Sequence, residues 1–304
     1  MNSPNIPTLF HRQRLLLGIL KAIGEPVGNR DFQKLLFFYC NTVETTPSYD
    51  FVPHQYGAFS FTSYADRKKL IKAELVEDSS EAWSLTEHGK RYLKDKGERE
   101  IRLGLSWADL RGDPLVAKSY RLFPYYATRS VIAGDILAGD NFTLKRIDDL
   151  KPVPGKPGVA TIGYEGHSVE SYMRVLLDAG VTVLSDVRKN PLSRKFGFSK
   201  GMLSEICREL GVRYIHIPQL GIESAKRKKL ENQGNYDLLF TEYRIEVLPR
   251  ADIELEAIHQ LVKEGHLVAL TCYENAPSQC HRTCVAEALQ QQFGDQCRPK
   301  HMGG

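Results

Sequence analysis

The amino-acid sequence predicts an α/β protein: a Rossmann-like parallel sheet with helices on both faces, preceded by a mainly helical, winged-helix-like domain. Apolar residues at helical spacing dominate the first half, whereas short continuous apolar runs alternate with helical segments after residue 158. Between these regions the segment KPVPGKPG at 151–158 interrupts both helix and strand. We therefore expect a winged-helix-like domain with a helical extension over 1–150, a linker over 151–158 and a Rossmann-like domain over 159–304.

The composition is that of a globular protein outside the membrane. Hydrophobic residues make up 42% of the 304 residues, charged residues 26%, and the formal net charge is +4. This small net charge does not by itself indicate a nucleic-acid partner, so any prediction of such a partner depends on local clusters of basic residues. The longest apolar runs are far too short to cross a bilayer, and the N-terminus lacks a secretory signal. We expect a cytoplasmic protein whose six cysteines are thiols, and we predict no oligomeric state.

Three helices followed by a β-hairpin form the predicted N-terminal domain. The helices are expected at 9–23, 30–43 and 61–75, two short extended pieces within 75–86, a further helix at 87–94 and more helix over 105–145. This order is that of a winged helix, which docks a helix in the DNA major groove. The residues expected on the surface of the third helix, in contact with DNA, are Arg67, Lys68, Lys69 and Lys72. The alternative is a helical module that binds a protein partner.

Two stretches of this domain resemble known families. KAELVED at 72–78 with AWSLTEHGKRYL at 82–93 resembles winged-helix domains. QKLLFFYCNTV at 33–43 with PHQYGAFS at 53–60 resembles the Panacea-type domain of toxin–antitoxin and phage-defence proteins. The first resemblance implies binding to DNA or protein, and the second implies a role in phage defence.

Four buried strands joined by helices form the predicted C-terminal sheet. The strands are expected at 159–163, 181–184, 212–217 and 266–270, and the helices at 168–179, 199–210, 235–247, 253–263 and 278–293. Continuous apolar strands separated by helices indicate a parallel sheet, whose ligands bind beyond the carboxyl ends of the strands. The residues expected at this edge to bind substrate or phosphate are Gly163, Tyr164, Arg188, Ser193, Arg194, Lys195, His216 and Arg282.

The same edge gathers the residues expected to carry catalysis, which are Asp186, Cys272, Glu274, Cys280 and His281. Ser278 is expected to cap the last helix and to place Cys280 in its first turn, where the helix N-terminus favours anions and acidifies a thiol. Cys280 is then a candidate nucleophile, with Glu274 or His281 as its proton partner. The alternative is that this thiol packs against the sheet as a small apolar group.

A metal is another use of these thiols. Cys272, Cys280, His281 and Cys284 offer zinc ligands, but their C-x7-C-H-x2-C spacing matches no standard pair of short ligand turns. We therefore predict no metal and no resident cofactor, with zinc as the alternative. The turn after the first strand lacks the glycine pattern of a dinucleotide site, and the sequence has no Walker loop.

Asp186 follows the second strand and has two interpretations. It can act as a general base or orient a sugar hydroxyl, or it can form a structural salt bridge with Arg188 or Arg282. The arginines and lysines beside it suit phosphate, because a guanidinium binds two phosphate oxygens at once. A second basic run, at 226–229, follows the third strand. These clusters predict an anionic substrate.

Four motifs, in order, carry a further resemblance. TIGYEG at 161–166, DVRKNPLSRKFGFSK at 186–200, YIHIPQLG at 214–221 and LTCYENAPSQCHRTCVAEAL at 270–289 resemble the family catalogued as domain of unknown function 488. The resemblance spans 159–293, implies a Rossmann-like domain and leaves the activity open. The sequence departs from the family pattern at Gly221-Ile222, where a glycine pair is expected.

Together these residues predict a DNA-associated hydrolase or transferase that acts on a nucleic acid or nucleotide, by cleaving or modifying a base, sugar or phosphate linkage. A site that combines carboxylates, thiols and arginines favours an enzyme over a sensor. Two alternatives stay open. One is a DNA-binding regulator whose Rossmann-like domain senses a small anion or redox state without catalysis, and the other is a protein-interaction module.

Overall fold

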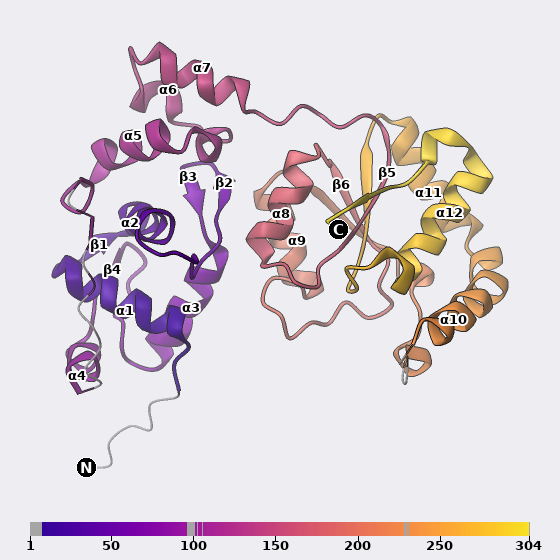
Figure 1. Ribbon diagram of the computed structural model, residues 1–304, viewed down its shortest axis with the longest axis horizontal. Helices are drawn as coiled ribbons and strands as arrows, with labels where there is room; N and C mark the ends of the chain where they lie inside the picture. The colour runs from indigo at the N-terminus through magenta and orange to yellow at the C-terminus, as the bar shows by residue number, and fades with distance from the viewer. Residues whose placement is uncertain are drawn as a thin grey trace. The chain divides into compact units, whose positions relative to one another are not determined.

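The computed structural model describes residues 8–95, 101, 103–104, 106–227, 230 and 232–303. The chain divides into two compact units, Met1–Lys151 and Pro152–Gly304, and their elements are labelled in Figure 1. The proline-rich segment carries no helix or strand over residues 151–157. Among the described residues, no helix is both long enough and apolar enough to cross a membrane.

The N-terminal unit is built on helices and two small antiparallel sheets (Figure 1). Strand β1 (Val27–Gly28) pairs with β4 (Ala82–Trp83), and β2 (Val52–His54) pairs with β3 (Gly57–Phe59). The helices are α1 (His11–Ile23), α2 (Asn29–Thr42), α3 (Phe61–Lys72), α4 (Glu87–Asp95), α5 (Gly112–Leu122), α6 (Ala133–Ile136) and α7 (Asn141–Asp149). The helical extension expected over 105–145 is thus divided into short helices. The hairpin formed by β2 and β3 lies between the second and third expected helices, where the sequence predicts no strand.

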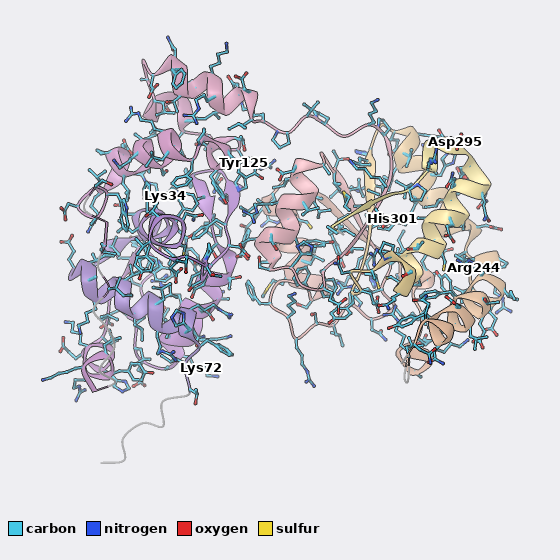
Figure 2. The ribbon with its side chains drawn as sticks, in the orientation of Figure 1. Lys34, Lys72, Tyr125, Arg244, Asp295 and His301 are labelled. Carbon is cyan, nitrogen blue, oxygen red and sulfur yellow. The ribbon has the colours of Figure 1, made fainter. Side chains whose placement is uncertain are left out.

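Aromatic side chains and a buried lysine mark the core of this unit. Phe32 of α2 stacks on Trp83 with ring centroids 4.0 Å apart, which joins α2 to β4. Lys34, also on α2, is buried in the same unit (Figure 2). Its Nζ donates a hydrogen bond to the carbonyl of Ala58 at 3.0 Å, and burial lowers its pKa to about 7.

A five-stranded parallel sheet forms the centre of the C-terminal unit, which confirms the predicted α/β class. The strands are β5 (Gly158–Gly163), β6 (Val183–Asp186), β7 (Arg213–His216), β8 (Leu267–Cys272) and β9 (Lys300–Met302), in the spatial order β7-β6-β8-β5-β9. The sequence predicts the first four. Strand β9 is short and polar, has no apolar run, and pairs only with β5 at the edge of the sheet.

Helices cover the sheet on both sides. Figure 1 shows α8 (Val169–Asp178) and α9 (Lys200–Glu209) on one side, with α11 (Asp252–Lys263) and α12 (His281–Phe293) on the other. Helix α10 (Gln233–Glu246) shares a hydrophobic cluster with α11 and α12. Because all five strands are parallel, the loops after β5, β6 and β8 begin at the same edge.

Candidate functional site

Asp186, the last residue of β6, is fully buried and forms an ion pair with Arg188. Its Oδ1 accepts hydrogen bonds from Nε of Arg188 at 2.8 Å and from the backbone N–H of Arg188 at 3.1 Å, and its Oδ2 accepts from the hydroxyl of Tyr214 at 2.7 Å. Nη1 of Arg188 donates to the hydroxyl of Tyr164 at 3.0 Å and to the carbonyl of Phe198 at 2.9 Å. The structure therefore shows the salt bridge with Arg188, and a catalytic role of Asp186 stays a prediction.

Beside this ion pair lies a cavity of about 310 Å³, which we call the cationic cavity. Its lining residues are Tyr164, Arg188, Lys189, Asn190, Leu192, Ser193, Arg194, Ile222, Arg227 and Tyr273. Lys189 forms an ion pair with Glu223 at 3.3 Å. Arg194 is exposed and pairs with no carboxylate among the described residues, so its guanidinium is available to an anion. Four residues that the sequence predicts to bind substrate or phosphate, namely Tyr164, Arg188, Ser193 and Arg194, surround this one cavity.

A second group of polar side chains, the thiol–imidazole cluster, joins the end of β8 to the start of α12. It consists of Cys272, Glu274, Cys280 and His281. Sγ of Cys272 lies 3.4 Å from Oε2 of Glu274 and 3.6 Å from Nδ1 of His281. Nε2 of His281 lies 2.9 Å from the carbonyl of Val187, directly after β6. The loops after β6 and β8 therefore meet at the same edge of the sheet.

The two thiols of this cluster differ in acidity, and the prediction that Cys280 is acidified is wrong. Burial raises the pKa of Cys280, and the neighbouring Cys272 and Glu274 raise it further, so this thiol is not acidified. Burial alone would also raise the pKa of Cys272, but a hydrogen bond from Cys280 and the neighbouring His281 and Arg227 side chains lower it well below its ordinary value. The acidified thiol is Cys272, at the end of a strand.

The start of the last helix explains this reversal. Helix α12 begins at His281, and Cys280 itself occupies the N-cap position in an extended conformation. Ser278, predicted to be the cap, belongs to a preceding 3-10 turn over Pro277–Gln279. Cys280 therefore precedes the first helical turn, and its side chain is buried, which disfavours the charged thiolate.

Arg227 connects the thiol–imidazole cluster to the cationic cavity. Its Nη1 lies 3.3 Å from Oε1 of Glu274, and its Nη2 lies 2.8 Å from Nδ1 of His281 and 3.7 Å from Sγ of Cys272. The same side chain lines the cationic cavity and a smaller cavity that Glu274 and His281 also line. Burial raises the pKa of Glu274, the nearby Cys272 raises it further, and Arg227 partly opposes this.

Two residues predicted to bind phosphate have structural roles instead. Arg282 is fully buried, and its guanidinium donates to the carbonyls of Glu274 and Asn275, so it holds the loop after β8 and does not face the cationic cavity. Gly163 lies where β5 meets that loop. A Cβ atom at position 163 would lie 1.9 Å from the carbonyl oxygen of Glu274, so only glycine allows this approach.

Lys195 and His216 lie near the cationic cavity without lining it. Nζ of Lys195 donates to the carbonyl of Tyr164 at 3.2 Å. Nε2 of His216 donates to the carbonyl of Arg188 at 2.9 Å, and Lys200 lies 3.1 Å from the other ring nitrogen. Both side chains therefore fix the backbone of loops that carry lining residues. Ser193 lines the cavity, and its hydroxyl accepts from the backbone N–H of Lys195 at 3.1 Å.

On the N-terminal unit, three of the four residues predicted to contact DNA are exposed. These are Lys68, Lys69 and Lys72 of α3; Figure 2 labels Lys72. The prediction that Arg67 lies on the surface is wrong: it is 7% exposed, donates to the carbonyl of Ala82 at 2.6 Å, and stacks over Trp83 at 4.8 Å. Arg67 therefore holds the segment that leads into β4 against α3.

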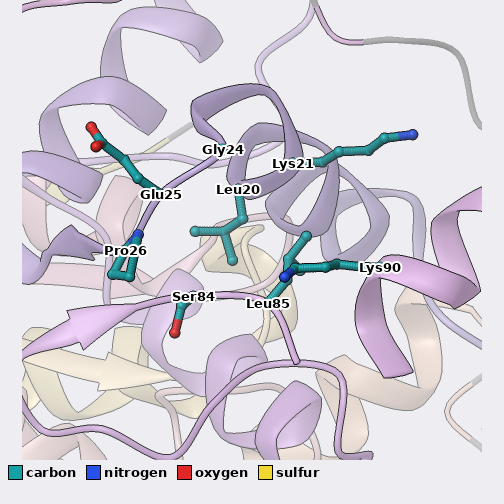
Figure 3. Close-up of a pocket in the computed structure, with 8 residues that line it drawn as sticks. All are labelled: Leu20, Lys21, Gly24, Glu25, Pro26, Ser84, Leu85 and Lys90. Carbon is teal, nitrogen blue, oxygen red and sulfur yellow. The ribbon is translucent and has the colours of Figure 1, made fainter. Parts of the chain in front are cut away.

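A separate cavity in the N-terminal unit lies between α1, the turn that follows it and the start of α4 (Figure 3). Its volume is about 380 Å³. Leu20, Pro26 and Leu85 give it an apolar wall, and Lys21 and Lys90 stand at its margin (Figure 3). No thiol, histidine or aspartate lines this cavity among the described residues, so it lacks the groups that distinguish the C-terminal site.

Comparison with known proteins finds that part of the C-terminal unit is similar to one family. The model of the family described as Domain of unknown function DUF488 matches residues 168–289, from the start of α8 into α12. This match supports the resemblance indicated by the four sequence motifs. Searches of curated proteins and of solved structures return no match. The winged-helix and Panacea-type resemblances of the N-terminal unit stay predictions.

Sequence reasoning singles out the basic run at 226–229 but not Arg227 as its important member. Lys228 and Lys229 lie outside the described residues. Tyr273, which lines the cationic cavity and is 44% exposed, was also missed. Its position between Cys272 and Glu274 is the signal that could have identified it, because residues that follow a parallel strand face the same edge.

Proposed function

We propose that the protein is a hydrolase or transferase that acts on a nucleotide or nucleic acid whose phosphate binds in the cationic cavity. The observation that carries this proposal is the position of Arg227, which lines the cavity and also contacts Glu274. A phosphate held between Arg194 and Arg227 leaves the rest of the substrate beside the thiol–imidazole cluster. Guanidinium groups suit this role because they stay charged and bind phosphate through two hydrogen bonds.

Glu274 is the acid–base group of the proposed reaction. Its carboxyl side chain is 18% exposed and contacts Arg227, which lines the cationic cavity. A carboxyl group whose pKa is raised by burial can give a proton to a leaving group or take one from an attacking water near neutral pH. The exposed ring of Tyr273 adds a face on which a base can stack.

The test of this proposal is turnover by the Glu274→Gln variant on 5′-nucleotides and on single- and double-stranded DNA, with products identified by mass spectrometry. We expect turnover to fall by about 10²-fold or more, since general acid–base groups typically contribute that much, while substrate binding persists. Glu165→Gln is the matched control, because Glu165 is an exposed carboxylate at the same edge and its amide replacement still accepts from the N–H of Asn275. Unchanged turnover in Glu274→Gln would remove Glu274 from the reaction, whereas a wild-type protein that turns over none of these substrates would favour the non-catalytic regulator.

The N-terminal unit is the proposed nucleic-acid-binding part, and the exposed lysines of α3 support it. Each lysine that contacts a phosphate contributes about 0.9 to the slope of log affinity against log salt concentration. Reversing the charge of Lys68, Lys69 and Lys72 together should therefore reduce the slope by about 2.7 if all three contact phosphates. Lys145→Glu, on the exposed surface of α7, is the control. An unchanged slope would remove α3 from the interface.

A further inference from the structure

Three potential metal ligands converge inside the C-terminal unit. Cys272 ends β8, and Cys280 and His281 begin α12. Their sulfur and nitrogen atoms all lie within 4.8 Å of one another, and each residue is at most 1% exposed. Zinc binds thiolates at about 2.3 Å and imidazole nitrogens at about 2.0 Å in a tetrahedron, so neighbouring ligand atoms lie about 3.5 Å apart. The 3.6 Å between Sγ of Cys272 and Nδ1 of His281 already fits this geometry.

The imidazole of His281 is oriented as a ligand. Its Nε2 lies 2.9 Å from the carbonyl oxygen of Val187, which can only accept a hydrogen bond, so the ring proton belongs on Nε2. Nδ1 then presents its lone pair to the interior of the cluster. A backbone carbonyl that fixes the ring in this way is the usual outer partner of a metal-bound histidine.

A cation already contacts two of the three ligand atoms. The guanidinium of Arg227 lies 2.8 Å from Nδ1 of His281, 3.7 Å from Sγ of Cys272 and 3.3 Å from Oε1 of Glu274. Nitrogen, sulfur and carboxylate acceptors that converge on one positive group form a site suited to a positive ion. Arg227 is 25% exposed and also lines the cationic cavity, so its side chain has space to turn away.

We propose that Cys272, Cys280 and His281 bind a zinc ion, with the fourth position facing Glu274. Both thiols bind the ion as thiolates, and their two negative charges balance the charge of the ion. Glu274 then lies beside the open position, where it can bind the ion directly or accept a proton from a bound water. Metal binding itself does not depend on the proposed enzymatic function, whereas a use of the metal in catalysis rests on it.

The first measurement is the zinc content of the full-length protein, purified under reducing conditions without chelators, by mass spectrometry of the metal. The second replaces zinc by cobalt(II), whose absorption spectrum distinguishes tetrahedral thiolate ligation from other sites. We expect about one metal ion per chain and a thiolate-to-cobalt charge-transfer band. A folded wild-type protein that holds no zinc and shows no such band would overturn the proposal without recourse to any variant.

Variants then assign the ligands. Cys272→Ser and His281→Gln should each lower metal affinity by at least about tenfold, with circular dichroism to confirm that the chain is folded. Cys284→Ser is the matched control, because Cys284 is a buried thiol on the same helix that is not part of the cluster. Retention of the cobalt band by both ligand variants would also contradict the site. A protein that binds metal but turns over no nucleotide would reject the proposed function and leave the metal site standing. A metal-free wild type that is active, and whose Glu274→Gln variant is inactive, would reject the metal site and leave the proposed function standing.

Discussion

Replacing Asp186 by asparagine tests the view that this carboxylate has a structural role, which is to hold Arg188 in place at the cationic cavity. The variant removes one charge from an ion pair in which Asp186 is 0% and Arg188 5% exposed. Arg188 keeps its hydrogen bonds to Tyr164 and Phe198 but loses its charged partner. Breaking a buried ion pair by removing one partner costs about 3–5 kcal/mol, because the remaining charge stays away from water. This is a large part of the total stability of a domain, which is about 5–15 kcal/mol.

Urea unfolding measures this loss. Both tryptophans, Trp83 and Trp107, lie in the N-terminal unit, so tryptophan fluorescence follows that unit alone, whereas far-ultraviolet circular dichroism follows both units. The circular-dichroism transition of the C-terminal unit should shift to lower urea, and the fluorescence transition serves as an internal reference.

Two comparisons decide the interpretation. Glu205→Gln breaks an exposed ion pair with Arg208 and should leave the transition where it is. The double variant Asp186→Leu with Arg188→Met removes both buried charges and should recover much of the lost stability, since apolar groups of similar size often replace a buried pair without loss. The reasoning is refuted if Asp186→Asn unfolds at the wild-type urea concentration but abolishes turnover, because Asp186 would then act on the substrate.

Three further predictions concern packing and pH. Gly163→Ala should displace the loop that carries Glu274 and lower both the stability of the C-terminal unit and its turnover. The control is Gly201→Ala on α9, where no atom lies within 4 Å of the added carbon, and it should stabilise the unit by up to about 1 kcal/mol. The urea midpoints of the two variants are compared. Lys34 has a pKa of about 7 when folded and 10.5 when unfolded, so the unfolded state binds the additional proton between these values and wild-type stability rises with pH across this range. The stability advantage of Lys34→Met should therefore shrink by up to about 5 kcal/mol between pH 7 and 10.5, and an advantage independent of pH would contradict this account. Arg67→Met should destabilise the N-terminal unit by about 2 kcal/mol by leaving the carbonyls of β4 and its turn without a donor, which the fluorescence transition measures.

Sequence periodicity was sufficient to predict the parallel sheet and the edge of the sheet at which the site lies. The apolar runs that became β5, β6 and β8 are continuous because these strands are buried on both faces of the sheet. Strand β9 could not be predicted this way, since a three-residue edge strand needs no apolar run. The burial of Arg67 could have been predicted from the sequence. Ser63 and Leu70, one helical turn away on either side, occupy the same buried face of α3.

The acid–base properties of the site could not be predicted from sequence, because they depend on contacts between residues distant in the chain. Spacing places Cys280 at a helix terminus and says nothing about its burial. The pKa of Cys272 is lowered in part by Arg227, which lies 45 residues away in the chain. Likewise the sequence is compatible with both a salt bridge and a catalytic use of Asp186, and the structure was needed to show the buried ion pair with Arg188.

The most direct test of the proposed site is the affinity for a nucleoside monophosphate, measured by isothermal titration calorimetry on wild type, Arg194→Glu and Arg213→Glu. Arg194 lines the cationic cavity, whereas Arg213 is exposed at the start of β7, the opposite edge of the sheet. The account predicts binding to wild type and Arg213→Glu, and at least about tenfold weaker binding to Arg194→Glu. Equal affinity of all three proteins would show that the anion binds elsewhere.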